Sequence, residues 1–183
     1  WSWSRGLGDV YKRQPLQLVA TQGQVQIHTS TFRGSFSVVL SEAIRSAGLG
    51  SQVLIAQFLR GGVNQGPNGA INLCGRLEWL RPAIETCLQE KILEEHLSLK
   101  RKYEEKSIKE LWEFCKSRLI EKKIDKIVLD EIGIAISLGF IEENDLIFMI
   151  NNRPSSTDII LTGPSIPPKV IEMADQITEL RCN

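Results

Sequence analysis

The stretch from Gln24 to Gly48 constrains the fold most, because two hydrophobic periods follow one another within it. Residues 24–28 alternate polar and apolar side chains, which is typical of a strand. From Phe36 to Ala47 the apolar side chains recur at spacings of three and four, which predicts a helix with one buried face. The stretch therefore predicts a strand, a sharp polar loop and a helix.

A second strand is expected directly after this helix. Gly48 and Gly50 are expected to end the helix with positive φ angles, and the apolar run at residues 53–58 then predicts a buried strand. In a β–α–β unit the loop after the first strand points backbone N–H groups and the positive end of the helix at a ligand, which is commonly a phosphate. Residues 30–37 are therefore the candidate phosphate loop.

Elements of the same two kinds continue along the chain. A glycine-rich loop at residues 60–76 is interpreted as a substrate lid or as a surface excursion. Further strands are expected at 77–80, 126–131, 158–163 and 175–180, and helices within 82–126 and at 132–138, 142–150 and 166–173. This alternation predicts an α/β protein with a mainly parallel sheet and helices on both faces.

Asp130 and Glu131 are the second candidate site. They end an apolar strand, so they are expected at the carboxyl edge of the sheet, where open α/β folds bind ligands. Two carboxylates suit Mg²⁺ and its water shell. The alternative is that Asp130 caps the helix at 132–138, because Asp is a favoured capping residue.

Composition excludes several classes of protein. The chain has 22 basic and 22 acidic residues, which argues against a nucleic-acid partner. Its four cysteines form no CxxC pair and are expected to be reduced thiols, so a cytoplasmic location is predicted. No apolar run has the length that a membrane span needs.

The N-terminus is unlike the rest of the chain. Residues 4–14, SRGLGDVYKRQ, resemble the in-frame translation of an adapter used in preparing sequencing libraries. Residues 1–14 are therefore interpreted as an adapter-derived, disordered artefact, and residues 15–183 as a single domain.

Residues 23–181 resemble the ATP:corrinoid adenosyltransferases. The resemblance depends on motifs in the order of that family, namely Asp130-Glu131, Gly139-Phe140, Arg153-Pro154, Leu161-Thr162-Gly163, Pro167-Pro168 and Glu179-Leu180-Arg181. Within the family, the chain looks like a divergent cyanobacterial branch. The resemblance implies a three-layer P-loop (RecA-like) homodimer that binds Mg-ATP and a reduced corrinoid, whose cobalt attacks the 5′ carbon of ATP.

Site residues carried over by position fall in two groups. The nucleotide group is Ser30, Thr31, Arg33, Gly34, Ser35 and Ser37, and the metal group is Asp130 and Glu131. The loop departs from the family, because Ser35-Phe36-Ser37 stands where the family has Lys-Thr-Thr and Phe32 takes a glycine place. Arg33 is expected to replace the lost lysine only in part.

Three functions remain open from the sequence. The first is an adenosyltransferase that retains ATP and corrinoid binding through a changed loop. The second is a catalytically inactive member of the family that serves as a nucleotide-binding or regulatory protein. The third is an unrelated binder of small molecules or phosphoproteins that uses the glycines from Gly61 to Gly75.

Overall fold

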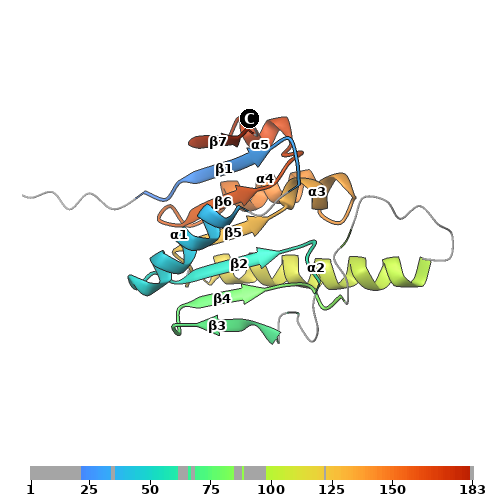
Figure 1. Cartoon of the computed structure of the whole chain (residues 1–183), viewed down its shortest axis with the longest axis horizontal. Coiled ribbons are helices and arrows are strands. Elements are labelled where there is room, and N and C mark those ends of the chain that lie inside the picture. Colours follow the sequence, from blue (N-terminus) through green and yellow to red (C-terminus); the bar gives the residue numbers. More distant parts are fainter. Residues whose placement is uncertain are drawn as a thin grey trace, which may run out of the picture.

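Buried apolar runs form the central strands of one mixed sheet (Figure 1). The computed structural model describes residues 22–33, 36–61, 66, 69–84, 88, 98–121 and 123–181, with the backbone alone at 98–100. The strands are β1 (Val25–Ser30), β2 (Val53–Gln57), β3 (Ile71–Leu73), β4 (Leu77–Leu80), β5 (Lys126–Asp130), β6 (Asp158–Thr162) and β7 (Gln176–Leu180). Their spatial order is β3-β4-β2-β5-β6-β1-β7, and every neighbouring pair is parallel except β3–β4.

Helices cover both faces of this sheet (Figure 1). They are α1 (Ser37–Gly48), α2 (Ser98–Ile120), α3 (Ile132–Ser137), α4 (Glu143–Asn151) and α5 (Pro168–Ile171). A hydrophobic core lies on each face of the sheet, and alternate strand residues belong to opposite cores. Ile55 and Val128 pack with α1, whereas Leu54 and Ile127 belong to the larger core with α2. The expected α/β class, with helices on both faces of a mainly parallel sheet, is confirmed.

α2 turns one apolar stripe toward the core. Its members are all buried, namely Ile108, Leu111, Trp112, Cys115 and Leu119. On the expected buried face of α1, Phe36, Val39, Ala43 and Ala47 are buried, whereas Ile44 is 40% exposed. Among the described helices, none is long and apolar enough to cross a membrane.

Two expected details of the fold are wrong, the loop at residues 60–76 and the φ angle of Gly48. The expected loop at residues 60–76 contains β3, which pairs with β4 across a tight turn. The strand is short and exposed throughout, so it leaves no hydrophobic period in the sequence. Gly48 is the last residue of α1 and does not have positive φ, whereas Gly50 has a φ of 110°.

The predicted boundary between residues 14 and 15 lies outside the described residues, so the domain assignment stays a prediction.

Asp145 in the first turn of α4 attaches this helix to α2. Its carboxylate accepts a hydrogen bond from Trp112 Nε1 at 2.6 Å and forms an ion pair with Lys116 Nζ at 2.8 Å. Burial by itself would raise the pKa of Asp145, but the hydrogen bonds from Lys116 and Trp112 outweigh this effect and hold the pKa below its usual value. The ionised carboxylate therefore stabilises the fold.

We expect Asp145→Asn to lower the free energy of unfolding at pH 7 by about 0.2–1 kcal/mol, the range for partly exposed ion pairs. Because the folded pKa is depressed, the contribution is present above the unfolded pKa and is lost as the pH falls through the folded pKa. Urea titrations of wild type and variant should thus differ at pH 7, and the difference should shrink as the pH falls from about 4 through the folded pKa of Asp145. Glu110→Gln, in an exposed pair of 3.9 Å with Lys106, is the control and should change stability little. A constant difference between wild type and Asp145→Asn at all pH values would contradict the assignment.

Candidate functional site at the carboxyl edge of the sheet

The loop after β1 lies at the carboxyl edge of the sheet. Ser30 is the buried last residue of β1, and its hydroxyl donates a hydrogen bond to the Phe32 carbonyl. Thr31 is exposed in the bend that follows, and Phe32 is 42% exposed. Ser37 is exposed as the first residue of α1. The other two sequence-predicted loop residues, Gly34 and Ser35, lie outside the described residues.

The N-terminus of α1 is suited to an anion. The residue before the helix is Phe36, which makes no capping hydrogen bond from its side chain, and the first turn carries no acidic residue. The first N–H groups of a helix have no partners within the helix, and the helix dipole adds partial positive charge there. Phe36 itself is 4% exposed and packs with Val39 and Ala43. It is therefore a core residue rather than a ligand-facing one.

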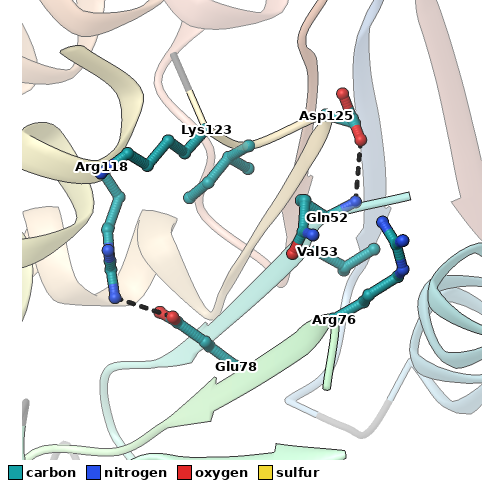
Figure 2. Close-up of a pocket in the computed structure, with 8 residues that line it drawn as sticks. Gln52, Val53, Arg76, Glu78, Arg118, Lys123 and Asp125 are labelled. Carbon is teal, nitrogen blue, oxygen red and sulfur yellow. Dashed lines mark hydrogen bonds and ion pairs between the residues drawn. The ribbon is translucent and has the colours of Figure 1, made fainter. Parts of the chain in front are cut away.

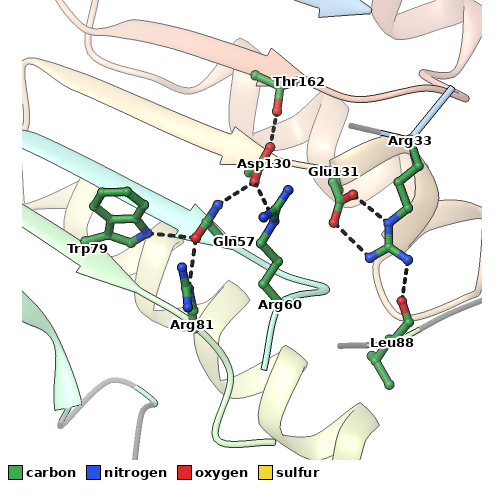
Figure 3. A network of polar contacts seen from close by, with 9 residues as sticks. All are labelled: Arg33, Gln57, Arg60, Trp79, Arg81, Leu88, Asp130, Glu131 and Thr162. Carbon is green, nitrogen blue, oxygen red and sulfur yellow. Dashed lines mark hydrogen bonds and ion pairs between the residues drawn. The ribbon is translucent and has the colours of Figure 1, made fainter. Parts of the chain in front are cut away.

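Arg33 connects this loop to the carboxyl end of β5. Its Nε and Nη2 donate to the two carboxylate oxygens of Glu131 at 2.6 and 3.0 Å, and its Nη1 donates to the Leu88 carbonyl (Figure 3). Arg33 is 31% exposed in its side chain, whereas the side chain of Glu131 is 2% exposed. Two of the sequence-predicted groups are thus brought together as a bidentate ion pair.

Asp130 forms a separate network beside this pair (Figure 3). Its Oδ1 accepts a hydrogen bond from the Thr162 hydroxyl at 2.6 Å, and its Oδ2 accepts one from Gln57 Nε2 at 2.7 Å. Arg60 Nε lies 3.8 Å from Oδ2. Burial raises the pKa of Asp130 above its usual value, and the hydrogen bonds from Thr162 and Gln57 offset this only in part.

Gln57 is the centre of the network. Its Oε1 accepts hydrogen bonds from Trp79 Nε1 and from Arg81 Nε, each at 2.9 Å. Because its oxygen takes two donors, its amide nitrogen must face Asp130. The last residues of β2 and β5 and the end of β4 are thereby held together at one edge.

The alternative in which Asp130 caps α3 is wrong. Glu131 is the residue that precedes the helix, and it makes no capping hydrogen bond from its side chain. Glu131 has a φ of 58°, in the left-handed region, so the chain turns sharply between the strand and the helix. Gly163 packs against this turn, since an added Cβ would lie 3.0 Å from Glu131 Cα. The carboxylate of Asp130 instead accepts the hydrogen bonds from Thr162 and Gln57.

Comparison with known proteins decides the family. The model of the family described as "ATP:corrinoid adenosyltransferase BtuR/CobO/CobP" matches residues 21–183. The chain belongs to this corrinoid adenosyltransferase family. Corrinoid adenosyltransferases of Escherichia coli and Salmonella typhimurium are each 25% identical to it, over 164 and 160 residues, covering 87% of this chain and 77% of the relative. A Nostoc protein described as uncharacterized is 24% identical over 168 residues, which are 87% of this chain and 44% of that protein.

Mg²⁺ is the ion that the resemblance places at Asp130 and Glu131. Carboxylate oxygens are suitable ligands in kind. In the arrangement described, however, each of the four oxygens already accepts a hydrogen bond from Thr162, Gln57 or Arg33. Within the described part of the chain, no three His, Cys, Asp or Glu residues are grouped so that they could hold a metal. The residues as they stand do not fit a directly bound ion, and the metal assignment of this adenosyltransferase-family protein stays a prediction.

Some residues of the site were not identified from the sequence. No chemical motif marks Gln57 or Arg60, although Gln57 is the first polar residue of an apolar strand, the same signal that identifies Asp130. Thr162 was recognised only as part of a family motif. Arg60 and Arg81 lie beside these residues because of the order of the strands in the sheet. That order cannot be derived from a single sequence.

A hollow of about 440 Å³ lies at the opposite end of the strands (Figure 2). It is lined by residues just before β2, β4 and β5, including Gln52, Arg76 and Asp125. Arg118 of α2 pairs with Glu78 of β4 at 2.7 Å, and Asp125 accepts the Gln52 N–H at 2.8 Å. These internal pairs connect α2 to the sheet. The carboxyl edge is therefore the better candidate in this adenosyltransferase-family protein.

Proposed function

We propose that this protein transfers the 5′-deoxyadenosyl group of ATP to the reduced cobalt of a corrinoid. The cobalt donates an electron pair to the 5′ carbon, a Co–C bond forms, the C–O bond to the phosphate breaks, and triphosphate leaves with that electron pair. The task of the protein in such a reaction is to position the two substrates and to neutralise the leaving group.

The observation that carries this proposal is the set of cations at the carboxyl edge. Arg33, Arg60 and Arg81 contact the polar groups at the ends of β2 and β5, where the described carboxylates number only two. The loop after β1 leads into a helix N-terminus without a side-chain cap. One guanidinium group can bind two phosphate oxygens through two parallel N–H bonds. This edge therefore suits a triphosphate even without the family lysine. Ser30, Thr31, Gly34, Ser35 and Ser37 belong to the same proposed nucleotide site.

The remaining features follow from the resemblance. We include in the proposal a homodimer, a cytoplasmic location and membership of the cyanobacterial branch, which the match to the Nostoc protein supports. The described cysteines, exposed Cys74 and buried Cys115, are free thiols, which agrees with a reducing compartment.

The alternative is an inactive family member that binds nucleotide or serves as a regulatory protein. It is favoured by one specific observation: Phe36 takes the position of the first family threonine and is buried in the core beneath α1. No hydroxyl is therefore available at that position for a phosphate or its metal.

Two measurements on the full chain test the proposal. Isothermal titration with Mg-ATP should give saturable binding. Incubation with ATP and a chemically reduced corrinoid should then give the absorbance of the adenosylated product together with an equal amount of triphosphate. The Escherichia coli relative serves as the positive control for the assay.

Ser35→Lys separates the two candidates, since it restores the family lysine and leaves buried Phe36 in place. If wild type forms no product while Ser35→Lys binds Mg-ATP more tightly than wild type, the inactive alternative is correct. If neither protein binds Mg-ATP at millimolar concentration, nucleotide binding at this edge is refuted.

A further inference from the structure

Arg33 and Glu131 differ in how far each is enclosed. The carboxylate of Glu131 is almost fully buried, and its backbone is held in a left-handed turn against Gly163. The side chain of Arg33 is 31% exposed, and the residue belongs to a segment, residues 31–33, that is exposed throughout. Of the two partners, Arg33 is therefore the one able to change its position without disturbing the core.

The ion pair also lies across the end of β6. β6 separates β1, which carries the loop of Arg33, from β5, which ends before Glu131. The Arg33 guanidinium also reaches the Leu88 carbonyl (Figure 3). The Leu88 N–H is in turn bonded to the Leu59 carbonyl, just after β2. The guanidinium thus lies over the carboxyl edge, where open α/β sheets bind their ligands.

We infer that Arg33 exchanges partners when a polyphosphate binds: it leaves Glu131 and binds phosphate oxygens, so Glu131 limits the affinity of the site. This inference rests on the proposed nucleotide site and identifies the polyphosphate chain as the group that Arg33 recognises. A guanidinium fork matches phosphate as well as it matches carboxylate. After the exchange, Glu131 is left as a buried charge without this partner, which is unfavourable. The buried carboxylate therefore opposes binding.

Glu131→Gln tests the exchange directly. A neutral amide holds Arg33 less strongly and leaves no buried charge behind. We expect this variant to bind sodium tripolyphosphate about tenfold more tightly than wild type, the factor for one charge-assisted hydrogen bond. Isothermal titration is done in EDTA, so that no metal contributes. A damaged fold lowers affinity, so a gain cannot come from structural loss.

Arg33→Gln and the double variant complete the cycle. Arg33→Gln should weaken tripolyphosphate binding by about tenfold. In the Arg33→Gln background, Glu131→Gln should give no gain, because the carboxylate acts through Arg33. Glu42→Gln removes an equal charge from an exposed pair with Arg45 on α1 and should leave affinity unchanged. Arg33→Lys replaces Arg33→Gln in the cycle if thermal melting shows that the latter is unfolded, and it should lose only part of the affinity.

The outcomes separate this inference from the proposed function. If wild type binds tripolyphosphate and Glu131→Gln binds equally or less tightly, the exchange is wrong and the nucleotide site stands. A gain in affinity that persists in the Arg33→Gln background likewise refutes the exchange, since the carboxylate of Glu131 then repels the anion directly and not through Arg33. If neither wild type nor Glu131→Gln binds tripolyphosphate or ATP, both proposals fail.

Discussion

Gly133→Ala is expected to lower the free energy of unfolding by about 3 kcal/mol, the upper part of the range for overpacking a core. Gly133 is buried in the first turn of α3, directly after the candidate site. A Cβ at this position would lie 2.4 Å from the Pro164 oxygen, 2.6 Å from Ser165 C and 2.7 Å from Ile166 N. These atoms belong to the backbone of the loop after β6, so they cannot rotate away. Thermal melting should show a midpoint about 6–12 °C lower.

Gly48→Ala is the matched control for this substitution. Gly48 is also helical, at the end of α1, and a Cβ there would have nothing within 4 Å. Since its φ is not positive, alanine fits the backbone, and we expect unchanged or higher stability, by up to about 1 kcal/mol. Equal effects of the two substitutions would show that the approach of α3 to the loop is not tight.

Gln57→Leu is expected to destabilise the protein by about 3 kcal/mol, because a buried polar group that loses its partner costs about 1–3 kcal/mol. The Gln57 side chain is buried and has three partners. Leucine would leave Asp130 Oδ2, Trp79 Nε1 and Arg81 Nε without the bonds that they make to this amide. The loss should appear as a lower midpoint in urea with an unchanged slope.

Gln26→Leu is the control for Gln57→Leu. Gln26 lies in β1, is only partly buried, and its amide donates to the exposed Gln24 side chain at 3.1 Å. The same change of residue type should there alter stability by no more than about 0.5 kcal/mol. A similar small effect at Gln57 would contradict the view that its amide connects the three strands.

Much of the fold was predictable because the strands are short apolar runs with clear ends. Lys126–Asp130 and Asp158–Thr162 were expected within one residue of their observed bounds, since each begins with a charged residue and is otherwise almost entirely apolar. β3 was missed because all its side chains are exposed, so only its pairing with β4 defines it. The first helix and its buried face were predicted by period alone, with Ile44 as the exception.

The candidate site was predictable only in part. Arg33, Asp130 and Glu131 were identified from their positions at strand ends and from the resemblance, and this would have been possible for Gln57 by the same reasoning. The sequence could not show that Arg33 pairs with Glu131, 98 residues away, and that Asp130 pairs with Gln57 and Thr162 instead.

The sequence by itself determined the class of fold, the buried faces and the family, because these depend on local hydrophobic periods and on motif order. Only the tertiary structure decided how the charges at the carboxyl edge are shared. The order β2-β5-β6-β1 sets which strand ends are neighbours, and distances of a few ångströms then decide which cation each carboxylate binds. Coulomb energy depends on these distances and on burial, and neither quantity is a property of the residues taken one by one.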